Sequence, residues 1–178
     1  WAPKNDQLTL WLPKIDCNAV KIPWQICAPS FVAQVSGENM PLGGKIQKID
    51  IEEYLCGVLS GEMPSDFNIE ALKAQAVCAR SFAYISGFGS ATNIVTPYNM
   101  CDTTSSQVYK GYGAEKKSTN EAVDATKGEL IYYQGKPVRA YYSSTSGGST
   151  ENVEDVWGTP MGYLRQVSDI YELDPELD

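Results

Sequence analysis

The spacing of apolar residues changes along this chain, and the changes divide it into predicted elements. Before residue 50, apolar residues come in short runs bounded by turn-forming residues, which predicts strands over 8–12 and 30–35 and a turn at 43–44. From Asp50 onward they recur every three or four positions, which predicts a helix with one apolar stripe. The stripe consists of Ile51, Tyr54, Leu55, Val58 and Leu59. The acidic residues of the first turn, at 50, 52 and 53, suit the helix N-terminus.

A second helix is predicted over 69–86, with Asn68 as its N-cap and Gly87 at its end. Small side chains at high density allow backbones to approach closely, so we expect this helix to lie at the centre of the core. The small residues are Ala71, Ala74, Ala76, Ala79 and Ala83. Lys73, Arg80 and Tyr84 share another face of the same helix. That face is either solvated or brings a cation to the site discussed below.

The second half of the chain alternates between shorter elements and polar loops. A capping-box pattern beginning at Ser118 predicts a helix that ends near Gly128. Strands are predicted over 130–133 and 138–142, around a turn at 134–136. We therefore predict an α+β fold, with central helices flanked by β-hairpins or small antiparallel sheets. Residues 1–44 form a β-type lead-in, and residues 45–178 form the main domain.

Composition and charge argue against some classes of binding partner. The 178 residues are 43% apolar and 20% charged, which is ordinary for a globular domain. The formal net charge of −8 argues against nucleic acid and against an anionic membrane surface, because both attract clustered cations. No apolar run is long enough to cross a bilayer. The chain begins with Trp1 and not with Met, as a processed form would after loss of a signal peptide or anchor.

The chain contains no histidine, which excludes Ser-His-Asp and Cys-His nucleophilic systems and His-ligated zinc. Its five cysteines form no C-x-x-C pair, so neither a zinc ribbon nor a redox motif is indicated. Cys56 and Cys78 lie within helical patterns and are expected to be buried free thiols. Cys17 and Cys27 remain candidates for a disulfide in an oxidising compartment.

Glu62 is the leading candidate for acid–base chemistry. It closes the first predicted helix just before Pro64, at the junction with the second helix. Loss of water at such a junction favours a protonated carboxylic acid, which can donate a proton. The alternative is an exposed carboxylate at a helix end, where most glutamates lie.

The loop over 143–151 is rich in hydroxyls and glycines. It offers many uncharged donors and acceptors, and its glycines allow backbone amides to reach a ligand. Such chemistry suits sugars, although an ordinary exposed linker has the same composition. Tyr141, Tyr142 and Trp157 would either stack on sugar faces or serve as core aromatics, and on the sequence alone the core is favoured.

Several motifs resemble those of the SpoIID/LytB family, the stage II sporulation protein D group and its relatives. The resemblance covers roughly residues 45–169 and is strongest over 54–64 (YLCGVLSGEMP) and 70–81 (EALKAQAVCARS). Further agreement lies at 102–109, 142–151, 154–158 and 163–165, in the family's order. The family's domain usually continues further, so we expect the domain to be truncated at its C-terminus.

The resemblance implies an extracytoplasmic enzyme of the cell envelope, a lytic transglycosylase that cleaves peptidoglycan glycan strands stripped of stem peptides by a partner amidase. Any membrane attachment would come through an anchor outside this chain. A lytic transglycosylase needs a single carboxylate and no cofactor, and Glu62 matches the family's catalytic acid. The same likeness assigns further residues to substrate binding or support: Lys73, Gln75, Arg80, Gln107, Tyr142, Ser146, Gly147, Gly148 and Thr150.

Two alternatives stay open. One is a hydrolytic muramidase that uses a second carboxylate such as Glu151 or Asp155. The other is a non-catalytic glycan-binding module that enhances an amidase. Some members of the family hold zinc through His and Cys, but here only Cys101 remains of such a set, so no metal is expected.

Overall fold

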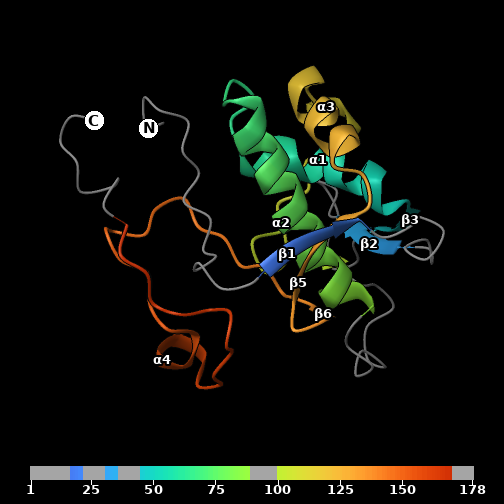
Figure 1. Cartoon of the computed structure of the whole chain (residues 1–178). Helices are drawn as coiled ribbons and strands as arrows, with labels where there is room; N and C mark the ends of the chain where they lie inside the picture. Colours follow the sequence, from blue (N-terminus) through green and yellow to red (C-terminus); the bar gives the residue numbers. More distant parts are fainter. Residues whose placement is uncertain (1–16, 22–30, 36–44, 89–99, 170–178) are drawn as a thin grey trace.

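The computed structural model of the protein describes residues 17–21, 31–35, 45–88 and 100–169. It confirms the α+β class. Helix α2 (Ile69–Phe88) runs through the centre, and α1 (Ile51–Glu62) and α3 (Lys117–Ala125) pack against it and against each other (Figure 1). None of the helices in these ranges has both the length and the apolar character that crossing a membrane requires.

Helix α1 forms as its sequence predicts. The Asp50 carboxylate caps it by accepting from the backbone N–H of Glu52 at 2.9 Å. All members of the predicted apolar stripe are buried, which places this face of the helix in the core. The helix ends where Met63 turns to an extended backbone, so Glu62 is its last residue, as predicted.

Helix α2 is the predicted alanine-rich core helix. Asn68 caps it by accepting from the backbone N–H of Glu70 at 2.9 Å. The helix runs to Phe88 and not only to residue 86, since a glycine such as Gly87 accepts helical dihedrals as well as the left-handed ones that end a helix. The predicted small residues are buried, except for the half-buried Ala74. Their size lets α1 and α3 approach α2 closely.

Two small sheets flank the helices. The first is antiparallel and has the order β1-β5-β6. The second has the order β3-β2-β4, in which the β2–β4 pair is parallel, so the prediction of antiparallel sheets fails for this pair. The strands are β1 (Cys17–Lys21), β2 (Phe31–Val35), β3 (Lys45–Ile49), β4 (Met100–Cys101), β5 (Glu129–Tyr133) and β6 (Lys136–Pro137).

The strands β1 and β2 precede the predicted domain boundary at residue 44, yet each pairs with strands that follow it. Within the described ranges, each sheet therefore combines residues from both sides of that boundary. The predicted strand over 8–12, the predicted turn at 43–44 and Cys27 lie outside the described residues.

The hairpin between β5 and β6 confirms the predicted turn but not the predicted second strand. Gln134 and Gly135 both have positive φ, 50° and 74°, as a tight two-residue hairpin turn requires. The return strand spans only residues 136–137, whereas we predicted 138–142. The alternation of apolar residues there has another cause, because Val138 and Ala140 pack against Cys78 of α2.

The predicted N-terminal cap of α3 is also wrong. The helix begins at Lys117 with Lys116 as its N-cap, two residues before the predicted cap Ser118, and the Thr119 hydroxyl accepts from the backbone N–H of Lys116 at 3.3 Å. Ser118 donates instead to the carbonyl of Ser65 at 2.6 Å, a contact between segments far apart in the sequence. A single turn of 3₁₀ helix, η2 (Tyr112–Ala114), precedes α3.

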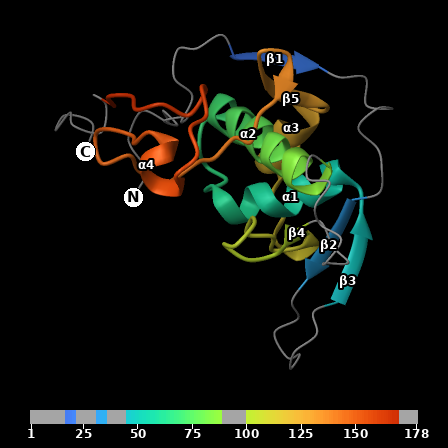
Figure 2. The ribbon, with the colours of Figure 1, turned by 90° about the horizontal axis from the view of Figure 1, so that it is seen from below.

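The C-terminal part lies to one side of the helical core. It carries the short helix α4 (Val153–Trp157), which the sequence pattern did not predict (Figures 1 and 2). Three backbone hydrogen bonds join residues 148–153 to residues 164–169: Thr150 N to Val167 O at 2.9 Å, Val153 N to Leu164 O at 3.2 Å and Asp169 N to Gly148 O at 2.9 Å. The segment is therefore a folded arm beside the core.

Candidate functional site

Glu62 lies at the end of α1, where the backbone of residues 107–110, called the crossing segment below, passes over the helix. Its Oε1 accepts from the backbone N–H of Val108 at 2.7 Å, and its side chain is half-buried. The crossing is possible because Gly61 has no side chain: a Cβ there would lie 2.4 Å from the Val108 carbonyl oxygen. One turn earlier, the carbonyl of Gly57 accepts from Lys110 N at 3.2 Å. Two glycines four residues apart thus create the surface on which this segment lies.

The ring of Tyr109 covers the first of these glycines. A Cβ at Gly57 would lie 2.4 Å from Cε2 of that ring. The ring also stacks on Tyr54, with centroids 5.2 Å apart. Hydrogen bonds from the backbone of Val108 and Lys110, together with the stacked Tyr54–Tyr109 pair, therefore hold the crossing segment against α1.

A buried hydrogen-bond cluster lies beside Glu62. The Gln107 carboxamide donates from Nε2 to the carbonyl of Ala79 and to the hydroxyl of Tyr142, each at 3.1 Å. Its Oε1 accepts from the Tyr54 hydroxyl at 3.3 Å. Tyr54 is 0% exposed and Gln107 is 1% exposed. All the polar groups of this amide are therefore occupied without water.

Tyr142 connects this cluster to Glu62. Burial raises the pKa of the Tyr142 phenol and the nearby negative charge of Glu62 raises it further, while the hydrogen bond from Gln107 acts in the opposite direction. The pKa of the Tyr54 phenol is also raised, mainly by burial and then by Tyr142. Both phenols therefore stay neutral at physiological pH and act as uncharged donors to their neighbours.

A pocket of about 290 Å³ opens on the other side of Tyr142. Its walls are mainly hydroxyl-bearing and aromatic side chains, with one carboxylate and one aliphatic side chain: Tyr141, Tyr142, Ser143, Thr145, Ser146, Ser149, Thr150, Glu151, Val156 and Trp157. Tyr142 is thus both a wall of the pocket and a neighbour of Glu62.

An aromatic pair forms one side of this pocket. The rings of Tyr141 and Trp157 are 4.6 Å apart at their centroids and are tilted by 32°. Trp157 is 56% exposed, so the reading of this residue as a core aromatic is wrong. It lies on α4, outside the helical core, and leaves an aromatic face open to solvent.

The loop that follows Tyr142 has a defined, hydrogen-bonded conformation and is not an ordinary exposed linker. Gly147 and Gly148 have φ of 66° and 90°, in the left-handed region that favours glycine. Ser146 donates to the Asp169 carboxylate at 3.2 Å, and Asp169 N donates to the carbonyl of Gly148 at 2.9 Å. The buried Thr150 accepts from Val167 N at 2.8 Å. Ser146 and Thr150 line the pocket, and their bonds to Asp169 and Val167 hold the loop in place.

The chain matches the SpoIID family, described as stage II sporulation protein, over residues 43–133, about half of its length. The chain belongs to this family. The stretch includes Glu62 and the crossing segment, whereas the pocket loop and α4 follow it.

Relatives of known name agree with this assignment. The chain is 37% identical over 134 residues to the stage II sporulation protein D of Bacillus amyloliquefaciens, covering 68% of this chain and 39% of that protein. The same values hold for the stage II sporulation protein D of Bacillus subtilis. It is 42% identical over 110 residues to the amidase enhancer of Bacillus subtilis, covering 62% of this chain and 14% of that protein. The chain therefore spans less than half the length of these relatives.

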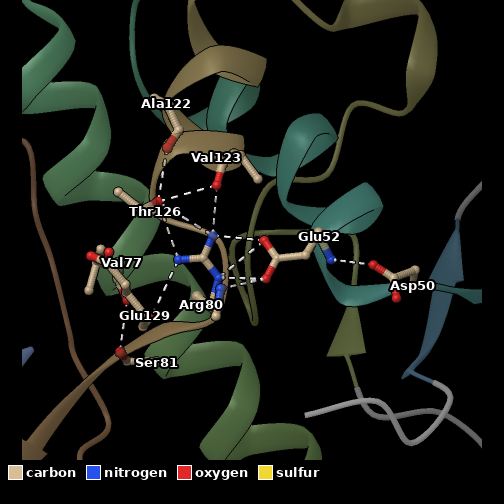
Figure 3. Close-up of polar contacts among 10 residues, drawn as sticks. Asp50, Glu52, Val77, Arg80, Ser81, Ala122, Val123, Thr126 and Glu129 are labelled. Atoms are coloured by element: carbon tan, nitrogen blue, oxygen red, sulfur yellow. Dashed lines mark hydrogen bonds and ion pairs between the residues drawn. The ribbon is translucent and has the colours of Figure 1, made fainter. Parts of the chain in front are cut away.

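Arg80, which the SpoIID resemblance assigned to the site, does not reach it. Its guanidinium is 2% exposed and bonds Glu52 through Nε at 3.0 and 3.2 Å and through Nη2 at 2.7 Å (Figure 3). The remaining N–H groups face Thr126 and the carbonyls of Val123 and Glu129. Glu52 is ten residues before Glu62 on α1, about 15 Å along the helix. The hypothesis that Arg80 lines a cleft with Glu62 is therefore wrong, and its contacts are those of an internal clamp.

The other two residues predicted from α2 differ in their surroundings. Lys73 is partly exposed and pairs with Glu70 at 2.7 Å, one turn earlier on the same helix. This contact fits the alternative of a solvated basic position. Gln75 is buried at 3% exposure and faces the interior. A part of either residue in substrate binding stays a prediction.

The cysteines bear out the expectation of free thiols at two positions. Cys56 and Cys78 are both free, the first half-buried and the second buried. Cys101 is also free and bonds Ser106 at 3.1 Å and Thr103 at 3.4 Å. Across the described ranges, no three side chains of His, Cys, Asp or Glu gather in an arrangement that could hold a metal ion.

Sequence reasoning missed several residues that shape this SpoIID site. Tyr54 was assigned only to the apolar stripe, yet its hydroxyl holds Gln107. Gly57 and Gly61 were not singled out, although glycines at i and i+4 within an apolar helix are a readable signal of close backbone approach. The amide of Val108 carries no sequence signal, because any residue except proline supplies it.

Proposed function

We propose that this chain carries the catalytic site of a peptidoglycan lytic transglycosylase. The reaction cleaves the bond between N-acetylmuramic acid and N-acetylglucosamine in glycan strands without stem peptides. The observation that carries the proposal is the double position of Tyr142, which lines the pocket and lies close enough to Glu62 for the charge of that carboxylate to raise its pKa. The Glu62 carboxyl group thereby lies behind one wall of a pocket suited to a sugar.

Glu62 serves in this reaction first as acid and then as base. As an acid it protonates the glycosidic oxygen, and the bond from that oxygen to C1 of N-acetylmuramic acid breaks. The C6 hydroxyl of the same sugar attacks C1 and closes a 1,6-anhydro ring, while its proton passes to the Glu62 carboxylate. Glu62 ends protonated as it began, and no water is consumed. One carboxylate is sufficient, which agrees with a half-buried glutamate at the end of α1.

The chemistry of the pocket favours a sugar ligand. The serine and threonine hydroxyls of the loop offer donors and acceptors to sugar hydroxyls and N-acetyl groups without charge. The Tyr141–Trp157 pair supplies an apolar face of the kind on which a sugar ring stacks. Glu151 is the single charged residue among those that line the pocket. A strand without stem peptides, whose only charges are its lactyl carboxylates, therefore suits this mostly uncharged surface better than a strand that also carries charged peptides.

Membership in the SpoIID family supports a role in the cell wall, and we place the protein on the extracytoplasmic side of the cell envelope. A cell-wall amidase that removes stem peptides is the expected partner, because it would generate the substrate. The similarity to the stage II sporulation protein D of two Bacillus species also suggests a role in sporulation.

The test compares the parent with Glu62→Gln on glycan strands with and without stem peptides, with products analysed by mass spectrometry. We expect 1,6-anhydro ends from the parent and a loss of about 10²–10⁴-fold in turnover for the variant. Glu53→Gln, an exposed carboxylate on the same helix, is the matched control and should retain full activity. Unchanged turnover in Glu62→Gln would refute the assignment.

The similarity to an amidase enhancer favours a second candidate, a glycan-binding module without catalysis. In that case the parent releases no product, and glycan binding is the same in the parent and in Glu62→Gln. A hydrolytic muramidase is the remaining alternative, with Glu151 of the pocket as its second carboxylate. Its products would carry reducing ends, one water heavier than the anhydro ends.

A further inference from the structure

The orientation of the Gln107 side chain follows from its neighbours. A backbone carbonyl can only accept hydrogen bonds, so the amide group that faces Ala79 O must be the nitrogen, Nε2. The oxygen, Oε1, then faces Tyr54 and accepts from its hydroxyl. Since Gln107 and Tyr54 are fully buried, no water can take the place of either partner. The amide is locked in one orientation.

That orientation leaves Tyr142 a single arrangement. Nε2 has two hydrogens, of which one goes to Ala79 and the other to the Tyr142 oxygen. The Tyr142 hydroxyl therefore accepts from Gln107, and its own hydrogen must point elsewhere. The neighbouring acceptor is the Glu62 carboxylate, whose charge acts on the Tyr142 phenol and whose Oε1 already accepts at 2.7 Å from the N–H of Val108, the residue after Gln107.

We infer that Gln107 is a positioning residue that sets the direction of the hydrogen bond between Tyr142 and Glu62. Through it, Tyr142 is a constant donor to the Glu62 carboxylate. This inference rests on the proposed function and deepens it. Two fixed donors, the Val108 amide and the Tyr142 hydroxyl, orient the carboxylate, so that its remaining lone pairs face the substrate. The bonds within the cluster act on the chemical step and not on glycan affinity.

Two substitutions of Gln107 separate the effect of the hydrogen-bond direction at Tyr142 from the effect of side-chain packing at position 107. Gln107→Glu removes the donor: as a carboxylate it has no hydrogen, and as an acid its one hydrogen goes to Ala79 O. Tyr142 must then turn its own hydrogen toward residue 107 and away from Glu62. Gln107→Met has a similar volume but no hydrogen bonds, so Tyr142 remains free to donate to Glu62.

The kinetic test compares these variants on stem-peptide-free glycan strands. We expect kcat to fall about ten- to hundredfold in Gln107→Glu, the effect of one lost hydrogen bond to a charged group, with KM unchanged. Gln107→Met should lose less than Gln107→Glu. In a Tyr142→Phe background the difference between the two should vanish, because the hydroxyl on which they act is absent. Equal kcat in the two variants, or additive losses with Tyr142→Phe, would overturn the inference.

A spectroscopic test needs no turnover. In protein labelled with ¹³C at tyrosine Cζ, the Tyr142 signal, assigned by its absence in Tyr142→Phe, should move on Glu62→Gln. In the Gln107→Glu background the same Glu62→Gln change should leave it in place. If Gln107→Glu does not fold, the Gln107→Met background serves, and there the signal should still respond to Glu62→Gln. A parent without activity but with this coupling refutes the lytic reaction alone, whereas an active parent without the coupling refutes the role of Gln107.

Discussion

Replacing Glu52 by glutamine should remove a large share of this protein's stability. Figure 3 shows why: the Arg80 guanidinium lies between Glu52 and the C-terminal end of α3, and every one of its nitrogens bonds a protein oxygen. The side chains of Arg80 and Glu52 are only 2% and 14% exposed. Glu52→Gln keeps the shape but leaves the arginine charge buried with no counter-charge.

The expected magnitude is about 3–5 kcal/mol, the cost of removing one partner of a buried ion pair. A domain of this size is stable by about 5–15 kcal/mol, so the loss is about a fifth of the total or more. Glu52 Oε1 also accepts from the Gly128 amide at 3.2 Å, so the variant weakens the start of β5 as well as the clamp. The double variant Glu52→Gln/Arg80→Met should be less destabilised than the sum of the two single variants, by about 2 kcal/mol or more.

The assay is urea unfolding followed by circular dichroism, with the free energy taken by linear extrapolation. Glu70→Gln is the matched control, because it breaks an ion pair of similar length that is largely exposed, with 31% and 74% of the two side chains accessible. Its effect should stay below about 1 kcal/mol. If Glu52→Gln also costs less than about 1 kcal/mol, the guanidinium reaches water and the clamp does not exist as described.

Three further predictions address the site. Gly61→Ala should abolish activity and cost about 1–3 kcal/mol in urea unfolding, since its Cβ would push the Val108 carbonyl away and break the bond to Glu62; activity at the parent level would contradict the crossing. Trp157→Ala should weaken glycan binding about tenfold in calorimetry while changing stability by less than about 1 kcal/mol, because the ring is exposed; unchanged binding would remove the aromatic pair from the ligand surface. Among the three cysteines whose side chains the structure describes, iodoacetamide near pH 8 should modify Cys101 first, Cys56 more slowly and Cys78 last. Burial opposes ionisation of Cys101, but hydrogen bonds with Ser106 and Thr103 lower its pKa, whereas burial raises the pKa of Cys56 to about 11 and of Cys78 to about 12. Peptide mapping reads the order, and early labelling of Cys78 would contradict its burial.

Local signals in the sequence predicted the helices that carry the site. Asn68 caps α2 as predicted, and Asp50, which was predicted only as an acidic residue of the first turn, caps α1; both bonds span two residues. Ser118 shows the limit of such signals, because the carbonyl of Ser65, far along the chain, offers its hydroxyl a better partner than the helix end. The alternation over 138–142 failed for a similar reason, since packing against α2 places Val138 and Ala140 on one side without a strand.

The site itself was predicted as a set of residues but not as an arrangement. Family likeness brought together Glu62, Gln107, Tyr142 and the serine-rich loop, whose surroundings the structure now describes. It also included Arg80, because a motif records which residue recurs and not which partner it has. Its partner, Glu52, is 28 residues away on another helix, and no periodicity connects the two. The exposure of Trp157 depends on where α4 lies, which is a property of the folded arm.

The Tyr142 phenol belongs both to the pocket wall and to the surroundings of Glu62. Ligand affinity and reactivity are therefore not independent of each other in this molecule. A ligand that touches that ring also disturbs the carboxylate behind it. Attempts to engineer tighter attachment should therefore start at the far, solvent-facing rim formed by α4. Substitutions of Tyr142 itself will change the rate of the chemical step and the affinity for the glycan together.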